Sequence, residues 1–405
     1  MKKIVCLKLE HFPQIYRDEP RVLTNSGLLG FWLRFRSVTG FFNPASSRKP
    51  CPKPKILAAH RYIFSVNALV GALLIFSGAK LSAQTNLFVA ADGSAAFTSV
   101  QSAIMSTPSG SRENPVVIHI APGTYHELVY IQREKRFFRL VGENPANTIL
   151  TYDLYAGITN VEGKPIGTFK TPSTTIDADD FTAENLTFEN AAGPVGQALA
   201  IRVDGDRASF RNCRFIGWQD TILLNRGRQY FEDCDIAGHV DFIFGAATAW
   251  FEKCHINCRS NGYITAASTP VDQPFGFVFS NCRITGDKPD VKTLLGRPWR
   301  IYASTIYLNC EMSAVVRPEG WFDWKKPEAH TTARYEEFNS TGAGASPQTR
   351  VDWAKQLTGA EAKKITIEKV LGGTDDWSPN LNPASGTNRL DLEPGAAGGA
   401  KSNHG

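Results

Sequence analysis

The stretch Asp233-Cys-Asp-Ile-Ala-Gly-His-Val-Asp-Phe-Ile-Phe-Gly245 opens with one copy of a short pattern that decides the fold. The pattern is a polar residue, Cys, a second polar residue and an apolar residue. Its copies are Asn212-Cys-Arg-Phe215, Asp233-Cys-Asp-Ile236, Lys253-Cys-His-Ile256, Asn281-Cys-Arg-Ile284 and Asn309-Cys-Glu-Met312, and an earlier copy, Asn185-Leu-Thr-Phe188, has Leu in place of Cys. Successive copies begin 27, 21, 20, 28 and 28 residues apart. Such a period, with one short apolar strand per copy, predicts a coiled array of strands.

Two carboxylates occupy the same phase of this repeat. Asp220 follows Cys213 by seven positions, and Asp241 follows Cys234 by seven positions. If each copy is one turn, the two Asp residues lie on adjacent turns, about 4.8 Å apart along the coil. Two carboxylates that close do not both ionise easily, so one tends to keep a proton. A lone Asp in a turn more often binds backbone N–H groups, but an acid and a base side by side favour hydrolase chemistry.

The rest of the chain is compatible with an all-β parallel β-helix. Residues 174–315 alternate short β-rich runs with Asn, Asp and Gly. A β-sandwich would show turn signals about every 8–12 residues and would lack the in-phase Cys unit. Apolar residues at helical spacing predict a short helix over 97–106 that caps the first turn. Residues 316–375, with a helix-like stretch at 354–364, are expected to pack outside the coil.

The basic charge of the chain belongs to its N-terminal segment. Residues 1–83 contain 13 Lys and Arg and 3 Asp and Glu, whereas residues 84–405 contain 31 and 36, a net charge of −5. The high isoelectric point therefore does not predict a nucleic-acid partner. The organisation that follows is a leader over 1–83, one domain over 84–375, and a disordered tail over 376–405 that is rich in Gly, Pro, Asn and Ser.

The leader reads as a secretory signal. Ile63–Phe76 is an apolar run interrupted by two polar residues, with basic residues before it and Leu81-Ser-Ala83 after it. The run is shorter than the roughly 20 residues that span a bilayer. The pattern therefore predicts export, to the periplasm or outside the cell, with cleavage near Ala83 and no stable membrane anchor. Residues 1–54 precede the signal and are interpreted as an upstream extension from a start codon assigned too early.

Several motifs together carry a specific resemblance. They are Gly123-Thr-Tyr-His-Glu127, Gly196-Gln-Ala-Leu-Ala200, Gly217-Trp-Gln-Asp-Thr221, Gly238-His-Val-Asp-Phe-Ile-Phe-Gly245 and Leu295-Gly-Arg-Pro-Trp299. In order and spacing they resemble the pectinesterases (pectin methylesterases), and the chain looks like a secreted member of bacterial type. The likeness covers roughly residues 86–377. It implies a right-handed parallel β-helix, in agreement with the repeat.

The resemblance also implies roles for individual residues. Asp241 would be the nucleophile that attacks the methyl ester of a galacturonate unit, and Asp220 the general acid and base. Gln219 and Gln197 would stabilise the oxyanion, and Arg297 would bind Asp241. These types suit the task, because Arg holds a carboxylate charged through paired hydrogen bonds and amide donors stabilise developing negative charge.

The substrate surface follows from the same likeness. Trp299 and Phe244 would form the apolar and stacking surface for sugar rings. Leu223 departs from the family, in which many relatives carry an aromatic residue, so it puts one sugar contact in doubt. The implied partner is methyl-esterified homogalacturonan (pectin), with no cofactor, and the protein is expected to be a monomer.

The repeat Cys residues raise the question of a disulfide. The spacing of 20 residues between Cys234 and Cys254 is the tightest in the repeat, and in-register neighbours would place their Cα atoms within disulfide range. Similar positions are bridged in bacterial relatives that the chain resembles. A Cys234–Cys254 disulfide is therefore expected, with a Cys213–Cys234 bridge or a ladder of reduced thiols as the alternatives.

Other readings are weaker. Cys254-His-Ile-Asn-Cys258 stands alone, so a zinc site is not expected. His126 and His239 are interpreted as incidental, because no Ser or Cys nucleophile motif accompanies them. Two rival functions remain open: a pectate lyase-like β-helix enzyme, which would need Ca²⁺ carboxylates, and a non-catalytic carbohydrate-binding β-helix.

Overall fold

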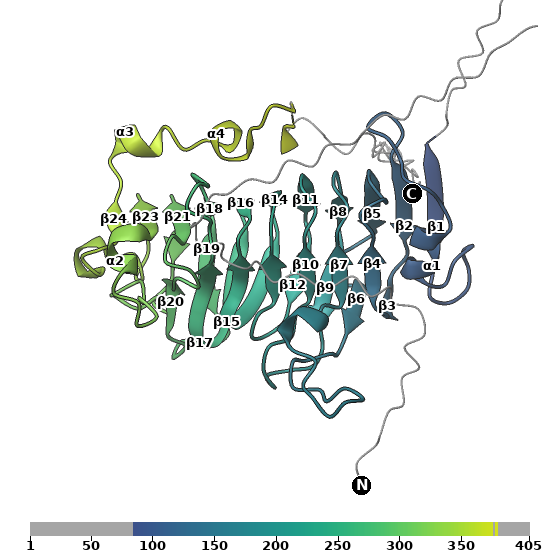
Figure 1. Ribbon diagram of the computed structural model, residues 1–405, viewed down its shortest axis with the longest axis horizontal. Helices are drawn as coiled ribbons and strands as arrows, with labels where there is room; N and C mark the ends of the chain where they lie inside the picture. The colour runs from purple at the N-terminus through teal and green to yellow at the C-terminus, as the bar shows by residue number, and fades with distance from the viewer. Residues whose placement is uncertain (1–83, 376, 380–405) are drawn as a thin grey trace, which may run out of the picture. The chain divides into compact units, whose positions relative to one another are not determined.

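The computed structural model describes residues 84–375 and 377–379 (Figure 1). The predictions made for the leader, its cleavage site and almost all of the tail fall outside these residues. Among the described residues, no helix has the length and apolar character needed to cross a bilayer.

The strands form a coil in which each turn contributes to three faces, and every pairing between named strands is parallel. Figure 1 shows these strands stacked along the coil, from β1 at one end to β24 at the other. The first face is an unbroken sheet of β1 (Thr85–Val89), β2 (Val116–Ile120), β5 (Phe138–Gly142), β8 (Thr182–Glu184), β11 (Ala208–Arg211), β14 (Arg228–Glu232), β16 (Thr248–Glu252), β18 (Phe277–Ser280), β21 (Ser304–Leu308), β23 (Arg334–Phe338) and β24 (Lys355–Gln356).

The other two faces are joined through two long bent strands, β15 (Asp235–Gly245) and β17 (His255–Ala267), which run across both. The second face also contains β3 (Gly123–His126), β6 (Thr148–Tyr152), β9 (Thr187–Asn190), β12 (Arg214–Ile216), β19 (Arg283–Gly286) and β22 (Glu311–Met312). The third face also contains β4 (Val129–Ile131), β7 (Thr174–Ile176), β10 (Ile201–Val203), β13 (Ile222–Leu224) and β20 (Thr293–Gly296). This arrangement confirms the predicted parallel β-helix.

The interior is built from rows of identical positions on successive turns. Phe210, Phe231, Phe251, Phe279 and Tyr307 are paired in register and stack with ring centroids 4.8, 4.7, 4.5 and 4.6 Å apart. All five are completely buried. Because each aromatic ring covers the next, the row removes a continuous apolar surface from water and fixes the register of the turns.

The polar residue that precedes each Cys of the repeat has a structural reason. It lies at the corner between the first and second faces, where the backbone takes a positive φ that Asn and Asp tolerate better than other side chains. The corner residues are Asn185, Asn212, Asp233, Lys253, Asn281, Asn309 and Asn339. Some of the Asn side chains also bond from turn to turn, as in the 2.7 Å hydrogen bond that Asn212 donates to Asn185.

The first turn is capped by the predicted short helix, α1 (Val100–Met105). Its buried face consists of Val100, Ala103 and Ile104, and the hydroxyl oxygen of Ser99 accepts a hydrogen bond from the N–H of Ser102 at the helix start. The helix therefore covers the apolar interior that the first turn would otherwise expose.

The C-terminal part only partly matches its prediction. Within residues 316–375, β23 and β24 continue the first face of the coil instead of packing outside it. The helix-like stretch at 354–364 contains a helix only from Gly359, because Thr358 and Glu361 form a capping box there. The short helical segments are η1 (Thr168–Lys170), α2 (Ala329–Thr332), η2 (Pro347–Thr349), α3 (Gly359–Ala362) and α4 (Ile367–Leu371).

The outer side of the first face is covered as predicted by the last of these helices. Val370 and Leu371 of α4 pack with Tyr230, Trp250 and Val278 on the sheet. Figure 1 shows α3 and α4 running along this side of the coil.

Candidate active site

The coil places Asp220 and Asp241 on neighbouring turns, as their spacing predicts. Ile222 pairs with Ile243 in register, and the N–H of Asp220 donates a 3.0 Å hydrogen bond to the carbonyl of Val240. Both Asp residues stand just before the third face, at φ values of 63° and 50°. Asp is among the few side chains enriched in this conformation, and both carboxyl groups are buried. The repeat thus aligns two buried carboxylates.

Arg297 binds only one of the two carboxylates through hydrogen bonds within the described residues. Its Nε donates to Oδ1 of Asp241 at 2.8 Å and its Nη2 donates to Oδ2 at 2.6 Å. Arg297 directly follows β20, and its own N–H is fixed by the carbonyl of Thr265 at 2.9 Å. This paired geometry is the strongest form of an Arg–carboxylate contact and favours the ionised form of Asp241.

The two carboxyl groups consequently differ in charge. Burial, followed by the charge of Asp241, raises the pKa of Asp220 to about 8, while the charge of Arg297 opposes this rise. Burial also raises the pKa of Asp241, but the hydrogen bonds and charge of Arg297 act in the opposite direction. Because the guanidinium faces Asp241 directly, we assign the negative charge to Asp241 and the proton to Asp220 at neutral pH.

Two amide side chains come from the turn of Asp220 and from the turn that precedes it. Gln197 and Gln219 form a parallel β-bridge, so they lie on adjacent turns at the same level, and Gln219 directly precedes Asp220. The N–H of Ala198 donates to the carbonyl of Gln219 at 3.1 Å, and the N–H of Ala156 donates to the carbonyl of Gln197 at 2.8 Å. Both side chains are partly exposed. The backbone around them is therefore fixed while the amides remain accessible.

An apolar cluster on the third face lies close in sequence to Asp241 and Arg297. Leu199, Leu223, Phe244 and Ala266 form a small cluster with Trp299 packed against it, and the rings of Phe244 and Trp299 lie 5.7 Å apart. Leu223 is fully buried within this cluster. The two aromatic residues expected to contact sugar are thus brought together beside Asp241 and Arg297.

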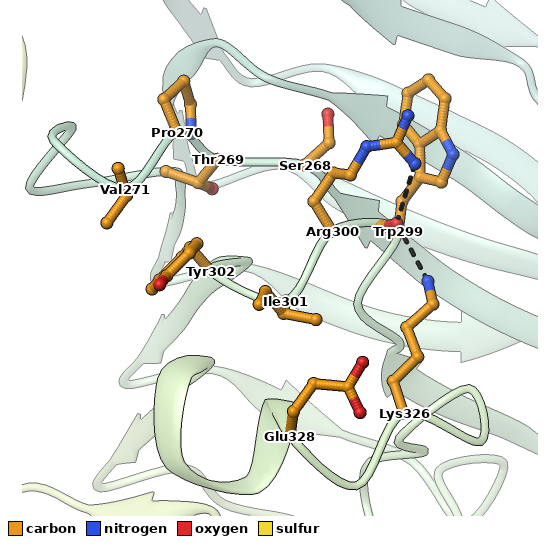
Figure 2. A pocket seen from close by; sticks show the side chains of 10 residues that line it. All are labelled: Ser268, Thr269, Pro270, Val271, Trp299, Arg300, Ile301, Tyr302, Lys326 and Glu328. Carbon is orange, nitrogen blue, oxygen red and sulfur yellow. Dashed lines mark hydrogen bonds between the residues drawn. The ribbon is translucent and has the colours of Figure 1, made fainter. Parts of the chain in front are cut away.

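A groove of about 400 Å³ extends from Trp299 (Figure 2). Arg300, Tyr302 and Lys326 line it together with Val271. Neither Asp220 nor Asp241 lines this groove. It is therefore a continuation of the surface beside Trp299 and not the place where the paired carboxylates lie.

Sequence reasoning missed three residues at the site. Tyr263 and Trp324 lie on the Arg297 guanidinium with ring centroids 4.0 and 3.7 Å away, and Lys326 lies over Trp324 at 4.7 Å. Tyr263 pairs with Val240 only through a register shift, since it follows Cys254 by nine positions whereas Val240 follows Cys234 by six, so the spacing of the repeat does not place it. Trp324 and Lys326 lie beyond the strands of the third face, where the repeat gives no signal.

The expected Cys234–Cys254 disulfide is not formed in the structure. Both residues are free thiols, and so is Cys213. Their strands pair in register, so both Cβ atoms point inward and stay about 4.8 Å apart. A disulfide joins Cβ atoms that are roughly 3.5–4.5 Å apart. The thiol of Cys254 instead contacts the carbonyl of Phe231, with Sγ 3.7 Å from the oxygen, in the ladder of reduced thiols that was the alternative.

The two histidines differ in their surroundings. His126 is exposed and faces Asp153 at 3.9 Å. His239 lies in the same strand as Asp241. Burial lowers the pKa of His239, and the charge of His239 acts to lower the pKa of Asp241. Among residues 84–375, no group of three His, Cys, Asp or Glu side chains is arranged to hold a metal ion.

A parallel β-helix with an Arg-bound carboxylate beside a protonated one defines a carboxylate-based hydrolase. Comparison with known proteins gives the family. A sequence model described as Pectinesterase matches residues 86–374. Pectinesterase 31 of Arabidopsis thaliana is 42% identical over 280 residues, which cover 68% of this chain and 88% of the relative. The chain belongs to the pectinesterase family and is a carboxylic ester hydrolase.

Solved structures agree with this family. Pectin methylesterase from carrot is 33% identical with a TM-score of 0.67, and the match covers 71% of this chain and 93% of the carrot chain. PemA from Erwinia chrysanthemi is 31% identical with a TM-score of 0.64, covering 74% and 99%. These structures include a plant and a bacterial enzyme, so they do not single out the bacterial type. Some plant relatives are longer, and the chain spans only 53% of Pectinesterase 4 of Arabidopsis thaliana.

Proposed function

We propose that this protein hydrolyses the methyl esters of galacturonate units in pectin, releasing methanol and leaving de-esterified pectin. The observation that carries the proposal is the difference in protonation between the two carboxyl groups. Arg297 binds Asp241 through two hydrogen bonds, and the neighbouring Asp220 has a pKa raised to about 8. A charged nucleophile next to a neutral acid is what ester hydrolysis by carboxylates requires.

The first half of the reaction forms an acyl-enzyme. A carboxylate oxygen of Asp241 attacks the ester carbonyl carbon, and the carbonyl π electrons move onto its oxygen. The amides of Gln197 and Gln219 donate hydrogen bonds to this oxyanion. When the carbonyl reforms, the bond to the methoxy oxygen breaks, Asp220 gives that oxygen its proton, and methanol leaves.

The second half returns the enzyme to its starting state. Asp220, now ionised, takes a proton from water as the water oxygen attacks the acyl carbon. The bond to Asp241 breaks, which restores its carboxylate and leaves a galacturonate carboxylic acid. Arg297 serves both halves, because it aims Asp241 during attack and stabilises its negative charge when it departs.

The surface beside the carboxylates suits a polysaccharide. Trp299 and Phe244 offer aromatic faces, which contact sugar rings without demanding buried polar partners. The groove that continues past Trp299 provides room for further units of the polymer. Pectin is therefore the proposed partner, with the protein acting as a monomer and without a cofactor.

We also propose that the protein is exported. Residues 1–83 would act as a leader whose signal is cleaved near Ala83, and residues 84–375 would be the catalytic domain, secreted to the periplasm or the medium. The proposal is supported by the basic, apolar and small-residue order of the leader.

A methanol-release assay on methylated pectin tests the function, with unsaturated sugar products monitored in the same reactions. Methanol release without unsaturated products is the expected result. Unsaturated products with no methanol would support the pectate lyase-like alternative. Binding to pectin without either product would support the non-catalytic carbohydrate-binding alternative.

A further inference from the structure

The loop of residues 322–328, here called the Trp324 loop, contacts Arg297 from outside the coil. The ring of Trp324 lies on one side of the guanidinium, with its centroid 3.7 Å from the central carbon. Tyr263 of β17 lies 4.0 Å from the same carbon. Two aromatic rings therefore limit how the guanidinium can move while it is bonded to Asp241.

The same loop also binds the backbone that follows Arg297. The Nζ of Lys326 donates to the carbonyl of Pro298 at 2.8 Å and to the carbonyl of Trp299 at 2.9 Å. Figure 2 shows the Lys326 side chain directed toward the Trp299 carbonyl. The loop thus holds one side chain and two carbonyls of three consecutive residues, 297–299.

The conformation of the loop is unusual. Trp324 and Lys325 both have positive φ, at 55° and 56°. The Asp323 carboxylate accepts a 2.8 Å hydrogen bond from the N–H of Lys325 and is 3.1 Å from His330 Nε2. Two successive non-glycine residues in this region are costly, and such conformations persist where surrounding contacts determine them. The contacts here include those of Trp324 and Lys326 with residues 297–299, and the packing of Trp324 against the apolar cluster of the third face.

We propose that Trp324 and Lys326 are positioning residues that keep Arg297 bonded to Asp241 and thereby keep Asp241 ionised and aimed. The inference rests on the proposed function, which gives Asp241 its role. Neither residue needs to touch the substrate for this purpose. The ring fixes the guanidinium, and the ammonium group fixes the backbone from which that guanidinium extends.

The charges around Asp241 support the electrostatic part of this role. The titratable and charged groups that interact with it from its own and neighbouring elements are Arg297, His239, Lys326, Asp220 and Tyr335. The positive charges of Arg297 and Lys326 stabilise the ionised carboxylate. Burial lowers the pKa of Lys326 itself, and Arg300 contributes to that effect. Loss of the Lys326 charge should therefore raise the pKa of Asp241.

The pKa of Asp241 can be measured without any turnover. The carboxyl carbon resonance of Asp241 is followed by NMR through a pH titration and assigned by its loss in Asp241→Asn. In Trp324→Ala and Lys326→Met, the pKa is expected to rise, whereas in Trp324→Phe it is expected to stay near that of the parent. Lys325→Met is the matched control, because Lys325 is the exposed neighbour of both residues and its loss removes one charge from the same loop.

Kinetics of the same variants give the second readout. We expect kcat to fall by about tenfold to a hundredfold in Trp324→Ala and Lys326→Met, since a small displacement of a catalytic group has effects of this size. KM should change little, and the acid limb of the pH profile should move to higher pH. Circular dichroism and thermal unfolding establish whether each variant is folded. If Trp324→Ala does not fold, the results for Lys326→Met test the positioning role.

The possible outcomes distinguish a failure of the positioning role from a failure of the proposed function. An unchanged pKa of Asp241 in both variants would overturn the positioning role, as would a rise in KM alone, which would mark Trp324 as a substrate contact. A parent protein that releases no methanol would refute the proposed function, while the NMR titration would still decide whether the loop controls the charge of Asp241.

Discussion

Arg297 donates two parallel hydrogen bonds to Asp241, at 2.8 and 2.6 Å, across 56 positions of sequence. The bond joins β15 to the end of β20, two turns further along the coil. A carboxylate is a weak nucleophile, so it must be kept charged and held in one orientation. This single contact provides both, and several expected outcomes follow from it.

Replacement of the nucleophile should remove activity and leave the fold intact. Asp241→Asn keeps the shape of the side chain but substitutes an amide, which is a poor nucleophile, so methanol release should fall by at least about a thousandfold. Asp235→Asn is the matched control, because Asp235 is the exposed first residue of the same strand. Activity of Asp241→Asn within about tenfold of the parent, with unchanged circular dichroism, would exclude Asp241 from this role.

Arg297 should not be replaceable by another cation. Arg297→Lys keeps the positive charge but presents a point charge in place of the planar fork, so one of the two bonds to Asp241 is lost. We expect kcat to fall by about tenfold to a hundredfold. The same change at the exposed Arg283 of β19 serves as the control and should have no effect. Equal activity of Arg297→Lys and parent would show that the paired geometry is unimportant.

The sequence predicts the part of the site that obeys the repeat. The phase of Asp220 and Asp241 relative to Cys213 and Cys234 placed the two carboxylates on adjacent turns, and the register of β13 and β15 confirms it. This worked because side-chain direction in a stacked coil is determined by position within the turn. The contact of Arg297 was implied by the family resemblance and has the expected geometry.

The remaining features depend on geometry that the repeat does not encode. Trp324 and Lys326 reach the site from a loop with positive φ values, for which the sequence offers no Gly or Asn as a signal. The disulfide was expected from Cα spacing, but parallel Cβ directions in the ladder keep Cys234 and Cys254 apart. β23 was missed because it follows a long insertion after β22 and lacks the Cys that marks earlier turns.

The export of the protein can be examined directly, although the leader lies outside the described residues. N-terminal sequencing of secreted material should begin near Gln84, because Leu81-Ser-Ala83 has the small residues that suit cleavage. Expression of the full chain and of a version starting near Leu57 provides the comparison. Both should yield the same mature end. Secreted protein that still carries residues 1–54 would refute the upstream-start interpretation.

The protonation state of Asp220 should make the activity depend on pH. Burial and the charge of Asp241 raise the pKa of Asp220 to about 8, and the proposed reaction needs its protonated form to release methanol. The rate of acyl-enzyme formation should therefore fall as pH rises through about 8. Asp220→Asn should lose most activity at every pH, and its residual rate should not show this alkaline limb.

The same pKa predicts the pH dependence of stability. Protonated Asp220 favours the folded state, because its pKa is about 8 when folded and about 3.9 in an unfolded chain. Its contribution is fully present below about pH 4 and is lost progressively as pH rises to about 8. Asp220→Asn cannot ionise, so it should match the parent in acid and exceed it above about pH 8 by on the order of a few kcal/mol. Urea unfolding across this range, with the exposed Asp272→Asn as the control, measures the difference. A constant difference between Asp220→Asn and the parent at all pH values would mean that Asp220 ionises as freely in the folded protein as in the unfolded chain, and its role as a proton donor would then be lost.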